Sequence, residues 1–197
     1  MTGLGLGAEK EVLRHRVLEL RDNLEPSDLE QKSLKIIEAV TSLPEYEKGR
    51  IVACYVDKGS EVQTRPLIRK ALASGKKILV PITLKNSIEL LFSEIPSLYE
   101  LSAGAYGIME PNPSKRKVRN VTTADLVIVP GIVWDIQGYR LGWGRGYFDA
   151  VLKKLWKGTP TIGLSFDLQL VEQVPREQFD LPVKILVTES RVIRYNA

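Results

Sequence analysis

The sequence predicts an α/β fold in which a mostly parallel sheet follows two N-terminal helices. Two apolar runs, 51–56 and 78–81, flank a segment of helical pattern at 64–73 that ends before Gly75. A strand-helix-strand succession of this kind favours parallel pairing with a right-handed crossover. A third apolar run at 126–131 has the uninterrupted hydrophobicity of a strand buried on both faces.

The first two helices are predicted from residues 8–48, which contain no glycine. Leucine and valine recur at helical spacing in the first helix, at Leu13, Val17, Leu20 and Leu24. Pro26 should end that helix, and Ser27 with Glu30 has the pattern of a capping box that opens the second. We expect the second helix to bury a stripe formed by Leu34, Ile37 and Val40.

Further strands are predicted downstream of the first two. Residues 88–95 alternate apolar and polar side chains, as an edge or antiparallel strand would. Residues 96–120 are loop-rich and include a short basic cluster at 115–119, a composition typical of a solvated loop. Strands are also expected at 159–165, 185–188 and 191–195, with a turn at 179–182 before the last pair.

A glycine-rich segment at 138–149 holds four of the fifteen glycines and separates the strand at 126–131 from a helix that begins near Tyr147. Glycine lets backbone N–H groups approach an anion closely, and a helix N-terminus adds positive partial charge. Arg140 and Arg145 add guanidinium groups that suit phosphate. We interpret the segment as a phosphate-binding loop, although glycine-rich connections that bind nothing also occur.

Neither standard nucleotide motif explains this loop. The glycines are not followed by Lys-Ser or Lys-Thr, which excludes a Walker P-loop. The spacing of Gly142, Gly144 and Gly146 differs from the dinucleotide fingerprint, and the loop starts too far from its strand.

The amino-acid composition limits the kinds of metal site and catalytic mechanism that this chain can have. The chain has 197 residues, 44% of them hydrophobic, which suffices for one domain with a sizeable core. Its single cysteine, Cys54, excludes an internal disulfide, and with one histidine a zinc cluster is not expected. Any metal should therefore be a hard ion on carboxylates, and catalysis should proceed by positioning and charge neutralisation, as in phosphoryl transfer.

Five segments resemble the 5-formyltetrahydrofolate cyclo-ligase family, also called 5,10-methenyltetrahydrofolate synthetase. They are Lys10-x-x-Leu13-Arg14, Glu61-Val62-x-Thr64, Gly107-Ile108-x-Glu110-Pro111, the block Val129-Pro130-Gly131 with Arg140-Leu141-Gly142-x-Gly144-x-Gly146-Tyr147-Phe148-Asp149, and Val187-Thr188-Glu189. The resemblance spans nearly the whole chain. The sequence departs from the family pattern at Phe179-Asp180, where the family usually has His-Asp.

The resemblance implies ATP- and Mg²⁺-dependent conversion of 5-formyltetrahydrofolate into the 5,10-methenyl compound, with release of ADP and phosphate. It implies that Asp149 and Asp180 hold Mg²⁺, that Tyr55 and Glu61 bind the folate, and that Arg145 and Tyr147 are catalytic. The implied ATP-binding residues are Lys10, Arg14, Arg140, Leu141, Gly142, Trp143, Gly144, Arg145, Gly146 and Tyr147. The expected architecture is a single domain over residues 1–197, a three-layer α/β/α sandwich around a mostly parallel twisted sheet with two N-terminal helices.

Several alternatives stay open. Lys10 and Arg14 alone would be interpreted as a solvated basic helix edge. The basic cluster at 115–119 is compatible with a non-catalytic nucleotide- or RNA-binding module, and Asp167 with a nicotinamide-binding oxidoreductase, although neither function has its full motif here. The same chemistry on a related pterin is a further alternative. The first seven residues lack the pattern of a secretory signal, and no apolar run reaches membrane-spanning length, so we expect a cytoplasmic monomer without nucleic-acid partners.

Overall fold

The structure is a computed structural model that describes residues 5–84, 87–104, 107–155 and 157–195. Its centre is an eight-stranded sheet in which the five strands β12, β10, β7, β1 and β2 run parallel. Strands β13 and β3 join antiparallel on either side. The α/β fold with a mostly parallel sheet is therefore confirmed. In sheet order the strands are β13 (Val192–Arg194), β12 (Ile185–Val187), β10 (Thr161–Leu164), β7 (Leu126–Val129), β1 (Ile51–Ala53), β2 (Lys77–Thr83), β3 (Leu90–Ile95) and β6 (Lys117–Arg119).

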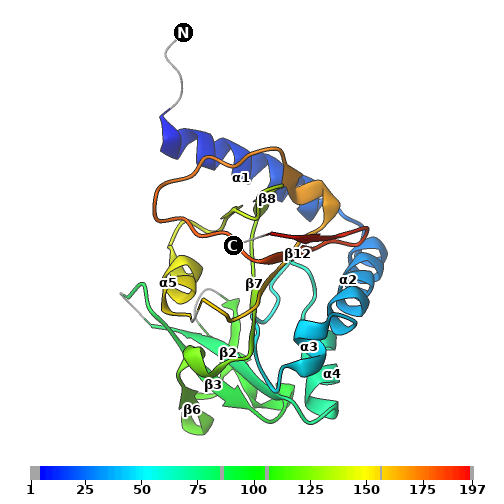
Figure 1. The fold of residues 1–197 in the computed structure, drawn as a ribbon, viewed down its shortest axis with the longest axis vertical. Coiled ribbons are helices and arrows are strands. Elements are labelled where there is room, and N and C mark those ends of the chain that lie inside the picture. The colour runs from blue at the N-terminus through cyan, green and yellow to red at the C-terminus, as the bar shows by residue number, and fades with distance from the viewer. Residues whose placement is uncertain (1–4, 85–86, 105–106, 156, 196–197) are drawn as a thin grey trace.

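Helices cover both faces of this sheet (Figure 1). Alternate residues of a strand point to opposite faces, and the two hydrophobic clusters follow that alternation. Val52 and Ile78 pack with helices α2 (Pro26–Thr41) and α4 (Arg65–Ala73). Their neighbours Ala53 and Leu79 pack in a second cluster with Val151 and Leu152 of α5 (Tyr147–Lys154). Helices therefore pack against both faces of the sheet.

Helix α1 (Leu6–Asp22) belongs to neither face and lies across the top of the molecule in Figure 1. It lies over the carboxyl edge of the sheet, because Arg21 contacts Ser60, in the loop that follows β1. Val17 packs with residues that follow β7, among them Ile132 and Val133. In an open α/β sheet this edge is where ligands bind.

The segment between β7 and the glycine loop forms a hairpin that the sequence did not predict. Strands β8 (Val133–Asp135) and β9 (Arg140–Leu141) pair antiparallel, and β11 (Leu170–Val171) adds to β8. The fully buried Asp135 carboxylate holds the turn by accepting backbone N–H groups from Gln137 and Tyr139, at 2.9 and 3.0 Å. The sequence predicted no strand here, because strands of two or three residues have too little pattern to detect.

The start of α2 also differs from expectation. Pro26 is its first residue and Glu25 its N-cap, with no side-chain capping bond, so the capping box of Ser27 and Glu30 is not formed. Proline suits this first position because its missing N–H would have no partner in the helix. A short helix α3 (Pro44–Lys48), which the sequence did not predict, follows α2.

The predicted stripes of the first two helices are confirmed in part, since Val17, Ile37 and Val40 are buried and Leu13 and Leu24 pack against the core. Leu20 and Leu34 are 48% and 43% exposed. In α2 the inward positions are Ser33, Ile36, Ile37 and Val40. In α1 the inward stripe is Lys10, Arg14, Val17 and Arg21, which has the same spacing as the leucine stripe. The helix therefore turns its cationic face toward the molecule.

Two smaller features complete the chain. Strand β6 lies within the region that we expected to be loop-rich, and it places β3 one position inside the sheet edge. Strands β4 (Leu101–Ala103) and β5 (Met109–Pro111) form a separate pair, and short 3₁₀ turns cover Leu98–Glu100, Pro113–Lys115, Val121–Thr123 and Asp167–Gln169. None of the helices in the described ranges has the length and apolar character needed to cross a membrane.

Trp134 gives a direct test of the packing. Its buried ring lies against Gly163 of β10, where an added Cβ would overlap the ring. Gly163→Ala should lower the free energy of unfolding by about 2–3 kcal/mol, since an overpacked core must displace its neighbours. Chemical denaturation measures this. Gly7→Ala in α1 is the control, because nothing lies within 4 Å of the added Cβ; an equal loss in both variants would contradict the packing.

Candidate active site

The glycine loop runs from β9 to the start of α5. Gly144 and Gly146 have positive φ angles of 82° and 68°, a conformation that favours glycine. Gly146 is the N-cap of α5, so the first N–H groups of this helix lie beside the loop. Trp143 and Arg145 are exposed, and Tyr147 is half-buried as the first residue of the helix. The described geometry offers backbone donors and a helix N-terminus to an anion.

Two cations of α1 reach this region across a long stretch of sequence. The Nε of Arg14 donates to the carbonyl oxygen of Gly142 at 2.8 Å, and a Cβ on Gly144 would lie 3.6 Å from Nη2 of the same guanidinium. The Nζ of Lys10 lies 3.4 Å from Oδ2 of Asp180 and 3.5 Å from Oε2 of Glu177. Both cations are largely shielded, with 14% of each side chain exposed.

Arg140 connects the two candidate metal ligands. Its side chain is only 3% exposed, and it donates to Oδ1 of Asp149 at 3.0 Å and to the carbonyl of Leu181 at 3.0 Å. Burial lowers the pKa of this guanidinium, and the charges of Asp149 and Asp180 oppose that shift. Asp149 and Asp180 therefore border the same buried cation, although 31 positions separate them in the sequence.

The chemistry of these donors fits Mg²⁺ bound together with phosphate. Among the described residues no group of three or more His, Cys, Asp or Glu side chains is arranged to hold a metal. Magnesium is often held by one or two carboxylates, with water and substrate phosphates as the other ligands. Asp149 and Asp180, with side chains 25% and 14% exposed, match that arrangement better than a cage made only of protein.

Glu61 and Tyr55 lie on the other side of the region, around the loop after β1. Oε2 of Glu61 accepts the backbone N–H of Lys58 at 3.0 Å. Burial raises the pKa of Glu61, while the Lys58 N–H, the Arg21 charge and the Trp143 indole oppose that rise. Tyr55 is buried and donates its hydroxyl to the carbonyl of Val62 at 3.1 Å.

Trp143 brings these two parts together. It belongs to the glycine loop, yet its indole interacts with the carboxylate of Glu61. Phe179, at the position of the family histidine, is 53% exposed, and Nζ of Lys153 lies 5.3 Å from the centre of its ring. The predicted phosphate and folate residues thus form one continuous region over the carboxyl edge of the sheet.

Sequence reasoning missed two charged groups of this region. Glu177 pairs with Lys10, and only its place three residues before Asp180 hinted at it. Arg21 lies on the same helical stripe as Lys10 and Arg14, at the i+11 and i+7 positions. That spacing indicates that Arg21 shares a face with Lys10 and Arg14, but the apolar leucine stripe predicts that a different face is buried.

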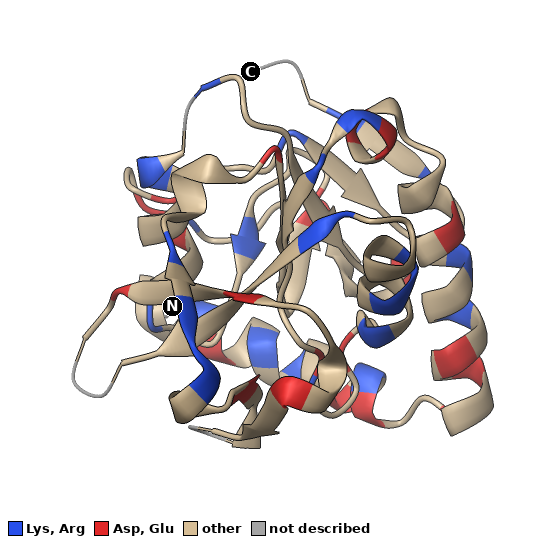
Figure 2. Cartoon of the chain, turned by 90° about the horizontal axis from the view of Figure 1, so that it is seen from below, with Lys and Arg blue, Asp and Glu red and all other residues tan. Residues whose placement is uncertain are grey.

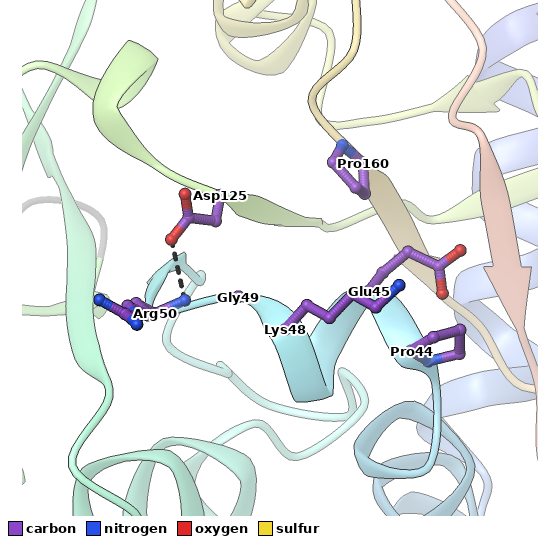
Figure 3. A pocket seen from close by; sticks show the side chains of 7 residues that line it. All are labelled: Pro44, Glu45, Lys48, Gly49, Arg50, Asp125 and Pro160. Carbon is purple, nitrogen blue, oxygen red and sulfur yellow. Dashed lines mark hydrogen bonds between the residues drawn. The ribbon is translucent and has the colours of Figure 1, made fainter.

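A hollow of about 500 Å³ lies elsewhere, at the opposite edge of the sheet (Figure 3). It is lined by residues that precede β1, β7 and β10, including Arg50, Asp125 and Pro160. Oδ2 of Asp125 accepts the backbone N–H groups of Arg50 and Ile51, and Glu45 pairs with Arg194. Its carboxylates therefore have structural partners, and it contains none of the predicted site residues.

Comparison with known proteins identifies the family of this chain. The sequence model of the 5-formyltetrahydrofolate cyclo-ligase family matches residues 7–189. A 5-formyltetrahydrofolate cyclo-ligase from Escherichia coli (strain K12) is 30% identical over 175 residues, which cover 87% of this chain and 96% of the relative. A probable 5-formyltetrahydrofolate cyclo-ligase from Schizosaccharomyces pombe is 30% identical and covers 84% and 88% of the two chains.

Two solved structures of methenyltetrahydrofolate synthetases are similar to this structure. The NMR structure of a 5,10-methenyltetrahydrofolate synthetase from Aquifex aeolicus superposes with a TM-score of 0.83 at 37% identity, covering 95% of this chain and 93% of that one. A synthetase of the same name from Mycoplasma pneumoniae has a TM-score of 0.75 at 19% identity, covering 91% and 98%, which shows the shared fold. The chain belongs to the 5-formyltetrahydrofolate cyclo-ligase family.

Proposed function

We propose that this protein converts 5-formyltetrahydrofolate into 5,10-methenyltetrahydrofolate with ATP and Mg²⁺. The formyl oxygen takes the γ-phosphoryl group and ADP leaves. N10 then bonds to the activated formyl carbon and gives up its proton, and the C–O bond breaks so that phosphate leaves as the ring closes. An amide oxygen is a weak nucleophile, so the help it needs is in-line placement and charge neutralisation.

The observation that best supports this proposal is the position of the cationic face of α1. It brings Lys10 to Asp180 and Arg14 to the glycine loop, so two cations from one helix border both the metal ligands and the phosphate loop. Arg14, with its fork of donors, would hold phosphate oxygens beside the backbone N–H groups of residues 142–147. Arg145 and Tyr147, at the start of α5, would contact the transferring group.

Arg140 has a different role in this proposal from that of Arg145. Its buried side chain is already paired with Asp149 and with the Leu181 carbonyl, so we infer that it orients Asp149. Asp149 and Asp180 would hold Mg²⁺, whose charge would neutralise the phosphates. Leu141, Gly142, Trp143, Gly144 and Gly146 would shape the loop around ATP, and Tyr55 and Glu61 would line the folate position.

The activity assay tests the whole proposal. Purified protein with 5-formyltetrahydrofolate should form the near-UV-absorbing methenyl product only when ATP and Mg²⁺ are both present, with one ADP for each product. Product without ATP, or no product with it, would overturn the assignment. A parallel assay with other formylated reduced pterins would reveal a preference for a related substrate.

An RNA-binding module is less well supported. The basic residues at 115–119 are largely paired with acids, since Lys115, Arg116 and Arg119 lie 3.5, 3.5 and 3.1 Å from Glu100, Glu110 and Glu94. In Figure 2 acidic and basic residues are interspersed along the chain. Neither observation favours a continuous phosphate-tracking surface.

Glu61→Gln should weaken folate binding about 10- to 100-fold and leave ATP affinity nearly unchanged, because a carboxylate accepts two N–H bonds from the pterin edge. Burial raises the pKa of Glu61, and the ionised form is the one that binds. Folate affinity of the parent protein should therefore fall as pH drops through a pKa above that of an ordinary glutamate. The variant should lose that pH dependence. Binding titrations measure both ligands, and equal loss for both would indicate a collapsed site.

A further inference from the structure

Arg21 is a buried cation to which the proposed reaction assigns no role. It lies in the last turn of α1 and is 2% exposed. Its Nε donates to Oγ of Ser60 at 2.9 Å, and the Ser60 hydroxyl in turn donates to Asp22. The adjacent helix C-terminus favours a positive charge, but this effect holds equally for an exposed arginine and does not explain the burial.

Most N–H donors of the Arg21 guanidinium have no hydrogen-bond partner among the described residues. It has five N–H donors, and among the described residues only Ser60 accepts one of them. Glu61 is the carboxylate with the strongest electrostatic effect on Arg21. None of the ion pairs found among the described residues joins these two side chains. None of the Arg21 nitrogens is among the buried side-chain atoms of the described residues that lack a hydrogen-bond partner, so its remaining donors are open to solvent and a bound ligand can reach them.

The place of Arg21 next to Glu61 matches the polar edge of a pterin. That edge presents the 2-amino group and N3–H, which are donors, followed by the 4-oxo oxygen, which is an acceptor. A carboxylate pairs with the two donors, and a neighbouring cation then meets the acceptor.

We propose that Arg21 recognises the 4-oxo oxygen of the substrate's pterin ring through its free Nη donors, beside Glu61. The inference rests on the proposed function, because it assumes that a pterin occupies the Glu61 side of the site. It makes Arg21 a specificity residue that separates 4-oxo pterins from 4-amino pterins. A 4-amino group presents hydrogens to the guanidinium, and a site built for an acceptor rejects such a replacement.

A cycle of protein and ligand changes tests this. Dissociation constants are measured without ATP for 5-formyltetrahydrofolate and for the same compound with a 4-amino group. The parent protein should prefer the 4-oxo compound about 30-fold or more, the range expected for a charged hydrogen bond. Arg21→Met should lose about 30-fold in affinity for the 4-oxo compound and little or none for the 4-amino compound. Arg21→Lys, which keeps the charge, should retain part of the preference.

The controls separate specificity from folding and from the proposed function. Arg16→Met removes an exposed arginine of the same helix and should change neither constant. Equal losses for both ligands in Arg21→Met would overturn the assignment, since Arg21 would then act only through the fold or through Glu61. If Arg21→Met does not fold, Arg21→Lys decides: a reduced preference supports the assignment and the full parental preference overturns it. If the parent protein binds neither compound, the proposed function fails and this assignment fails with it.

Discussion

Asp149→Asn should reduce ATP-dependent turnover by about 10³-fold or more at ordinary Mg²⁺ concentrations. The carboxylate lies in the first turn of α5, beside the glycine loop, and is one of two carboxylates that border Arg140. Asparagine keeps an oxygen for the Arg140 hydrogen bond but removes the charge that a hard cation needs. A loss of this size corresponds to about 4 kcal/mol of transition-state stabilisation. Steady-state rates over a Mg²⁺ titration measure it.

The structure adds a stability cost to this variant. Arg140 is almost fully buried, and the variant weakens its ion pair with Asp149, so a loss of about 1–2 kcal/mol in unfolding free energy is expected. Asp28→Asn is a matched control, because Asp28 is the third residue of α2 as Asp149 is of α5, and it is exposed. If Asp149→Asn keeps the parental turnover, Asp149 is not a metal ligand and serves only as a helix-terminal charge that pairs with Arg140.

Arg14→Ala should lose about 10²-fold or more in turnover, with a raised KM for ATP. The guanidinium of Arg14 lies beside the glycine loop, where it would grip phosphate oxygens that gain charge during transfer. Loss of its bond to the Gly142 carbonyl should cost only about 1 kcal/mol of stability. Kinetics with varied ATP, together with a melting curve, separate the two effects. Lys10→Ala should behave similarly because Lys10 faces Asp180.

The control for Arg14→Ala is Arg16→Ala, two residues away on the exposed face of α1. It removes the same charge from the same helix and should leave both KM and kcat at parental values. If Arg14→Ala and Arg16→Ala lose turnover to the same extent, the long-range electrostatic field of the protein is responsible and Arg14 is not a ligand group. If neither changes turnover, α1 is only a structural cover.

Much of the fold was predictable because its elements are long or strongly patterned. The buried strand β7, the β1-α4-β2 unit and the antiparallel strand β3 follow from apolar runs and alternation that are local properties of the chain. The β8-β9 hairpin was not predictable, because its strands are two or three residues long and Asp135 stabilises it from a fully buried position.

Residue types and spacing located much of the candidate site, but not the roles within it. The glycines, Arg145 and Asp149 form one local block, so they were found together. We expected the Arg140 guanidinium to contact phosphate. In the structure β9 buries this side chain against Asp149 and the Leu181 carbonyl, which the sequence did not reveal. The pairing depends on which side of a strand faces the core, and a two-residue strand does not reveal this.

By itself, the sequence determined the family, the parallel sheet and the glycine loop, since each depends on composition, periodicity or motif within a short window. Only the tertiary structure decided which face of α1 points inward. The leucine stripe and the cationic stripe have equal spacing, and the choice depends on partners that are 39 to 170 residues away: Ser60, Gly142 and Asp180. Helical periodicity predicts the helix and the residues that share each face. Contacts between distant segments determine which of these faces becomes part of the site.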